Sequence, residues 1–116
     1  MKILDQEIDF SFADADCLEK YETEYPKTVE KLDAIKTKSD KLDSQVIREF
    51  CQIIAEFLDN VLGEGTSQKL FKGKSNYKLC LSAFKALVEE KRAEDREDNE
   101  FLEYMNQYST DNVKGN

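Results

Sequence analysis

Residues 46–62 read VIREFCQIIAEFLDNVL and form the stretch that decides the fold. Their apolar side chains recur three, four and seven positions apart and occupy more than one face of a helix. Such a helix must be covered from several sides, either by the rest of the chain or by a partner protein. The stretch stops at residues 63–67, GEGTS, where Gly63 is a natural residue for the end of a helix. We therefore predict a central helix packed among other elements.

An amphipathic helix is expected before the central one. It begins at Ala15, with Asp14 as its capping residue, and its apolar residues follow a heptad-like spacing. Pro26 lies inside it and removes a backbone hydrogen bond at a cost of ~3 kcal/mol or more, which predicts a kink or a restart near that residue. Residues 39–44 are polar and form either a break before the central helix or a continuation into it, and we favour a break. The apolar positions of the first helix are Leu18, Tyr21, Tyr25, Val29, Leu32, Ile35 and Leu42.

Short polar segments mark where the following elements begin. We expect Asp43 or Ser44 to cap the central helix, because a side-chain oxygen there can accept a hydrogen bond from the first turn. After the central helix, Thr66 or Ser67 can cap a short helical turn in the same way. Residues 72–76, KGKSN, then read as a loop.

The last main helix should follow Asn76, a candidate cap, and lie antiparallel to the central helix. Its apolar face consists of Tyr77, Cys80, Leu81, Phe84, Leu87 and Val88. Residues 89–100, EEKRAEDREDNE, cannot build a core, although these residue types have fair helix propensity. A second apolar stripe follows at Phe101, Leu102, Met105 and Tyr108. We therefore predict a core domain over residues 1–88 and a charged helical extension over residues 89–116, frayed from Ser109 onward.

The N-terminal residues 1–12 alternate loosely between polar and apolar side chains, which indicates a short β-hairpin or an extended arm. A lone hairpin is marginal in water. Ile8, Phe10 and Phe12 must therefore pack on the helices or add to the sheet edge of a neighbour. The whole pattern predicts a mainly α fold: a small domain of three to four helices with a short N-terminal hairpin or arm.

The composition favours protein partners over nucleic acid or membrane. The 116 residues are 40% hydrophobic and 36% charged, with a net charge of −8, and their number suits one domain. Residues 1–24 carry eight acids and two bases, residues 25–88 carry eleven bases and eight acids, and residues 89–116 carry nine acids and four bases. A chain this acidic is repelled by nucleic acid and by anionic membranes.

Cysteine usage and hydropathy indicate a cytoplasmic protein. Cys17, Cys51 and Cys80 are odd in number and set among apolar residues, which fits reduced thiols in a core. No basic segment followed by an apolar one opens the chain. No apolar run approaches the ~18 residues of a membrane span.

The polar residues offer no catalytic or cofactor site. Gly73-Lys74-Ser75 fails as a phosphate-binding loop, because Gln68 stands where the motif needs glycine and no apolar strand precedes it. The acidic cluster at residues 14–19 lacks the glycine turn of a calcium loop. The sequence contains no histidine, the commonest general base and zinc ligand. We expect no enzyme activity, no cofactor and no metal.

Two sets of side chains are predicted to face a partner. One lies on the first helix and consists of Tyr21, Tyr25, Val29 and Leu32; the other is the stripe Phe101, Leu102, Met105 and Tyr108. The surplus of apolar surface on residues 46–62 also leaves self-association open. A run of lysines, Lys69, Lys72, Lys74, Lys78 and Lys85, is either a solvated face or a docking patch for an acidic segment, including the acidic tail of a second copy.

Four segments in this order carry a resemblance to a known class of protein. They are IDFSF at residues 8–12, ADADCLEKYE at residues 13–22, FLDNVLGEGTS at residues 57–67 and LCLSAF at residues 79–84. The chain resembles, roughly from Ile3 to Tyr108, the tail assembly chaperones encoded by siphophages and prophages of Gram-positive bacteria.

The resemblance implies a helical protein that binds the tape-measure protein during tail assembly and helps recruit tail-tube subunits. Two alternatives stay open. One is a structural head-tail or neck component of the virion, which mass spectrometry of purified particles would detect. The other is a small acidic regulatory protein that inhibits a host factor. A tape-measure gene immediately downstream would favour the chaperone hypothesis.

Overall fold

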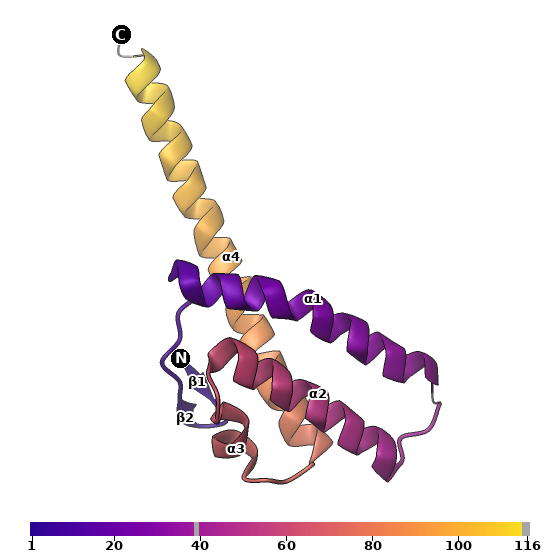
Figure 1. Ribbon diagram of the computed structural model, residues 1–116. Helices are drawn as coiled ribbons and strands as arrows, with labels where there is room; N and C mark the ends of the chain where they lie inside the picture. Colours follow the sequence, from indigo (N-terminus) through magenta and orange to yellow (C-terminus); the bar gives the residue numbers. More distant parts are fainter. Residues whose placement is uncertain (39, 115–116) are drawn as a thin grey trace.

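The computed structural model describes residues 1–38 and 40–114, and over these residues it is mainly helical (Figure 1). Two short strands form an antiparallel hairpin at the N-terminus, and the helices follow. The predicted fold class is therefore confirmed. In chain order the elements of the described residues are β1 (Lys2–Ile3), β2 (Gln6–Glu7), α1 (Ala15–Lys38), α2 (Ser44–Leu62), α3 (Thr66–Phe71) and α4 (Tyr77–Lys114).

The N-terminal segment pairs within its own chain. Lys2 lies opposite Glu7 in the hairpin. Leu4 and Asp5 form its turn with φ values of 49° and 65°, as in the two-residue turns whose twist suits a hairpin. The apolar side chains on either side, Ile3, Ile8, Phe10 and Phe12, are all buried in the core. Of the two predicted arrangements, packing on the chain's own helices is the one observed.

Helix α1 begins where the sequence predicts, because the Asp14 carboxylate accepts hydrogen bonds from the backbone N–H groups of Asp16 and Cys17, at 3.0 and 3.3 Å. The helix continues through Pro26, so of the two predicted alternatives, a kink or a restart, the restart is wrong. Pro26 lies on the exposed side of α1, where water can hydrate the carbonyl group that loses its partner. The opposite side packs against α2, and this packing outweighs the local cost of proline.

Helix α2 is the centre of the fold, as predicted. It follows a break, and the Asp43 side chain caps it by accepting a hydrogen bond from the backbone N–H of Val46 at 2.9 Å. It ends at Gly63, whose φ of 121° suits a residue without a Cβ atom. Helices α1, α3 and α4 all contact α2. Its buried side chains are Cys51, Ile54, Phe57, Leu58 and Val61.

The turn from α2 into α3 depends on Asp59, and the predicted capping by Thr66 or Ser67 is wrong. Gly65 occupies the cap position without a side chain to accept a hydrogen bond. Asp59 reaches over from the last turn of α2, and its two carboxylate oxygens accept from the backbone N–H and the hydroxyl of Ser67 at 2.8 and 2.9 Å. The Thr66 hydroxyl donates to the Gly63 carbonyl instead. The segment GEGTS is thus a corner held by a carboxylate.

Replacing Asp59 by alanine is expected to lower the free energy of unfolding by about 1–2 kcal/mol, because the N-terminus of α3 loses its only side-chain acceptor among the described contacts. Asp59→Asn retains one oxygen and should cost less. Urea unfolding monitored by circular dichroism measures both effects, with Asp33→Ala on the exposed face of α1 as control. Equal stabilities of Asp59→Ala and Asp33→Ala would refute the capping role.

Helix α4 runs without interruption from Tyr77 to Lys114. Its start is capped as predicted, since Asn76 Oδ1 accepts from the backbone N–H groups of Lys78 and Leu79 at 3.0 and 3.2 Å. The first half packs on the body and the second half projects from it, which makes the molecule 66 Å long and 19 Å thick (Figure 1). The predicted boundary after Val88 falls inside this single helix. The backbone is helical to Lys114, and the fraying expected from Ser109 onward stays a prediction. Gly115 and Asn116 lie outside the described residues.

The predicted antiparallel arrangement of α2 and α4 is wrong. The first turns of both helices lie together around one groove, which brings Phe50 near Tyr77, and further along the rings of Phe57 and Phe84 are 5.5 Å apart. The two helices therefore run in the same direction. Helix α3 and the loop after it carry the chain back along the body before α4 begins (Figure 1).

Candidate partner-binding site

The projecting part of α4 carries the largest exposed apolar side chains of the described residues. Every side chain from Asp95 to Tyr108 is exposed, so the helix leaves the body at Asp95. We call residues 96–114 the arm. Its exposed apolar side chains form the arm stripe: Phe101 (61% exposed), Leu102 (57%), Tyr104 (66%), Met105 (49%) and Tyr108 (63%). Four of these five were predicted, and Tyr104 adds to them.

The arm stripe continues the buried face of the same helix. On the body, Cys80, Phe84 and Leu87 follow each other at intervals of four and three residues and face the core. The same spacing of four and three residues continues through three polar residues to Phe101, Met105 and Tyr108. This is a heptad repeat whose middle is too polar to be buried. The exposed stripe therefore has the spacing by which helices pack against other helices.

A second apolar surface lies at the other end of the molecule. It is a groove of about 350 Å³ between the end of α1, the start of α2 and the start of α4. Leu42, in the segment that joins α1 to α2, is 59% exposed at its edge, and Lys36 is its one charged residue. We call this the apolar groove; its lining residues are Leu32, Ile35, Lys36, Leu42, Val46, Phe50, Tyr77 and Leu81.

The predicted partner-facing set on α1 is not a continuous exposed surface. Tyr21 is only 6% exposed and Tyr25 is half-buried. Leu32 lines the apolar groove, and only Val29 is fully on the surface, at 42% exposed. The structure brings the first two into the core and separates them from the last two. The heptad-like spacing of α1 identified a packing face and could not tell a core face from a binding face.

Tyr21 and Tyr25 belong to an aromatic cluster that joins three helices. Their rings stack 5.1 Å apart, and both meet Phe57 of α2 edge-on at 6.0 and 6.3 Å. Phe84 of α4 lies 5.5 Å from Phe57. Burial raises the pKa of Tyr21 to about 12, with smaller effects from Tyr25 and Asp95 in the same direction and from Arg92 in the opposite one. The cluster holds α1, α2 and α4 together.

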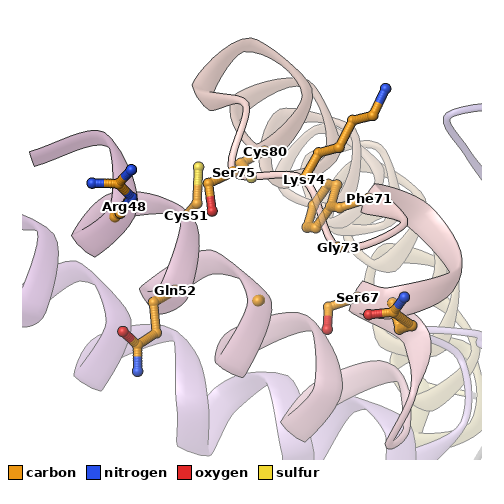
Figure 2. A pocket seen from close by; sticks show the side chains of 11 residues that line it. Arg48, Cys51, Gln52, Ser67, Phe71, Gly73, Lys74, Ser75 and Cys80 are labelled. Atoms are coloured by element: carbon orange, nitrogen blue, oxygen red, sulfur yellow. The ribbon is translucent and has the colours of Figure 1, made fainter. Parts of the chain in front are cut away.

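A pocket of about 360 Å³ with a mixed polar and apolar lining lies beside the loop that contains Gly73-Lys74-Ser75 (Figure 2). Two cationic side chains line it, Arg48 from α2 and Lys74 from the loop. Figure 2 shows that they extend in different directions and do not converge on a common point. The arrangement thus lacks the convergent donors that would clamp a phosphate group.

The Cys80 thiol, which lines this pocket, is not activated. Cys80 is fully buried, and burial, followed by a hydrogen bond with Cys51, raises the pKa of its thiol to about 12. A thiol with such a pKa stays protonated at neutral pH and is a poor nucleophile.

Among residues 1–38 and 40–114, no group of three or more His, Cys, Asp or Glu residues is arranged to hold a metal ion. Among the same residues, no helix combines the length and the apolar character needed to cross a bilayer.

The groove is the feature that sequence reasoning missed. Ile35, Val46, Phe50, Tyr77 and Leu81 were all recognised as apolar helix positions, but they were expected to be covered. Two sequence features pointed toward it: the surplus of apolar surface on residues 46–62, and Leu42, which was assigned to the apolar face of the first helix although it lies in the polar segment 39–44. These side chains share an open surface because α2 and α4 run in the same direction and their first turns lie together, which only the tertiary structure shows.

The comparisons with known proteins place the chain in a family. A comparison with curated proteins gave no match, and neither did a comparison with solved structures. A family model described as a family of unknown function, DUF6673, matches residues 4–115. The match extends from the turn of the hairpin to the end of the arm and covers nearly all of the sequence. The chain therefore belongs to the DUF6673 family.

Proposed function

We propose that this protein is a non-catalytic binding protein that holds apolar helical segments of another protein in the cytoplasm. The observation that supports the proposal most directly is the arm stripe, five large apolar side chains on a helix that has left its own core. Surface side chains of this size are ordinarily scattered singly, and a contiguous set on one helix marks an interaction surface. Amphipathic helices are recognised by other proteins through such a face.

The client named in the proposal comes from the resemblance to tail assembly chaperones. On that basis the partner is the tape-measure protein of a phage tail, and tail-tube subunits are recruited to the complex. The arm suits a client of long apolar helices, because helix against helix packing uses the heptad spacing of Phe101, Met105 and Tyr108. The absence of histidine from the sequence and the protonated Cys80 thiol favour binding over catalysis.

Co-expression with the tape-measure protein of the same genome tests the proposal. We expect a soluble complex that co-purifies, and we expect Phe101→Ser together with Met105→Ser to reduce the recovered complex about tenfold. Removing two half-exposed apolar side chains from a contact costs at least ~1.4 kcal/mol, which corresponds to that factor. The fold should be unaffected, because both side chains lie outside the core.

A matched control is Asn99→Ser together with Asn106→Ser, which changes two exposed polar residues on the same turns of the arm and should leave the complex intact. A tape-measure protein that stays insoluble and never co-purifies would refute the proposal. Loss of helicity in the Phe101 and Met105 variant would show instead that the stripe belongs to the core.

A further inference from the structure

We propose that two copies of this chain associate reciprocally, each placing its arm stripe in the apolar groove of the other. The two surfaces are the main apolar features that the described fold leaves open, and they lie at opposite ends of the molecule. Neither can cover the other within one chain, because the arm points away from the groove (Figure 1). A second copy supplies a complementary surface for both.

The position of the two surfaces along α4 permits a closed dimer. Tyr77 and Leu81 line the groove at the first turns of α4, and the arm stripe begins at Phe101 near its end. The midpoint of the stripe is about 38 Å from that of the groove along the helix, at 1.5 Å per residue. Two copies side by side and antiparallel, related by a two-fold axis near Arg92, would bring each stripe level with the other copy's groove. Both contacts then form at once, and the assembly closes without growing into a filament.

The lining of the groove and the arm carry opposite charges, although the exposed acids Asp40 and Asp43 flank Leu42 beside the groove. Residues 96–108 of the arm contain four acids and one base, Arg96. The groove contains one charged residue, Lys36, and no acid. Lys78 and Lys85 are exposed on the turns of α4 beside it. Opposite charges around an apolar contact set its orientation, and they make association weaker as salt screens them.

The area that can be buried favours this arrangement over pairing of the two arms alone. The five side chains of the arm stripe are 49–66% exposed. Together they present roughly 500 Å² of accessible surface, if a large side chain has ~150–250 Å² in total. Two arms packed only on each other would bury about 1,000 Å², below the ~1,200–2,000 Å² of stable interfaces. Two arms in two grooves bury four apolar surfaces and reach that range.

Sedimentation equilibrium of the chain alone tests the inference. We expect a mass of twice the 13.5 kDa of the chain, and a dissociation constant that rises with salt. Leu42→Glu places an acid at the edge of the groove and should raise the dissociation constant at least tenfold. Phe101→Ser with Met105→Ser should do the same from the arm, whereas Asn99→Ser with Asn106→Ser should leave it unchanged. Leu42 is 59% exposed, so its replacement should not disturb the fold.

Mixing the groove variant with the arm variant gives the decisive result. In a mixed pair the intact arm of one variant meets the intact groove of the other, so we expect two monomeric variants to form a heterodimer that is weaker than the wild-type dimer. A monomeric wild-type chain would overturn the inference. So would a dimer that survives Leu42→Glu but not the arm substitutions, because that pattern means pairing of arms. Lys36→Glu is a second groove variant if Leu42→Glu fails to fold.

The inference does not rest on the proposed function, because it concerns the chain without a client. The same variants keep the two ideas apart. Leu42→Glu should weaken the dimer at least tenfold and still co-purify with the tape-measure protein, whereas the arm variant should weaken both associations. A dimer without any client complex would refute only the proposed function.

Discussion

Replacing Phe57 by alanine is expected to lower the free energy of unfolding by about 3–5 kcal/mol, a large part of the ~5–15 kcal/mol available to a domain of this size. Phe57 is 1% exposed on the central helix. Its ring meets Tyr21 and Tyr25 of α1 and Phe84 of α4 at centroid distances of 5.5–6.3 Å. Alanine would leave a cavity where three helices meet, and no single element could move to fill it.

Urea unfolding followed by circular dichroism measures this loss. Phe101→Ala is the matched control, because it makes the same chemical change on the same kind of element at 61% exposure. It should alter the stability by about 0.5 kcal/mol or less. Comparable losses in the two variants would show that the arm belongs to the folded core and that the aromatic cluster does not organise it.

Stability should also fall steeply above pH 10, and Tyr21 is one cause. Burial raises the pKa of its phenol from 10.0 to about 12. Between these values the unfolded chain releases a proton that the folded chain retains, so the free energy of unfolding falls as the pH rises. The contribution of Tyr21 to the free energy of unfolding is fully present below pH 10 and is lost as the pH rises through 12. Two pKa units correspond to about 3 kcal/mol.

Cys80 acts in the same direction, because burial raises the pKa of its thiol from 9.0 to about 12. The fall should therefore begin near pH 9 and become steeper above pH 10. Measuring urea unfolding at a series of pH values gives the slope. Tyr21→Phe retains the ring and removes the titrating group, so its slope should be shallower, and Cys80→Ala should delay the onset. Identical curves for the three proteins would contradict the assignment to these two residues.

Local signals predicted the ends of the elements well. Asp14, Asp43 and Asn76 cap the helices that they were expected to cap, because a cap depends on the backbone within three residues of the side chain. The apolar density of residues 46–62 likewise predicted the central helix, and Gly63 ends it. The arm stripe was also predicted, because its spacing after a charged run is a property of the linear sequence.

Predictions failed where distant residues act together. Pro26 was expected to kink or restart α1; the restart does not occur, because packing of the opposite helix face against α2 keeps the helix continuous. Thr66 or Ser67 was expected to cap α3, but the carboxylate of Asp59, eight residues before Ser67, accepts the hydrogen bond from the Ser67 backbone N–H. Tyr21 and Tyr25 share a spacing with surface residues, and only the position of Phe57 and Phe84 makes them core.

The sequence by itself determined three features of this protein: the central helix at residues 46–62, the capping residues at which its helices begin, and the stripe of Phe101, Met105 and Tyr108 beyond a charged run. Each of these features depends on interactions along one helix. The tertiary structure alone decided which faces are covered. It set α2 and α4 running in the same direction and so opened the groove at Leu42 and Lys36. The direction of a helix relative to its neighbour depends on the summed packing of side chains from all elements, and no local pattern encodes it.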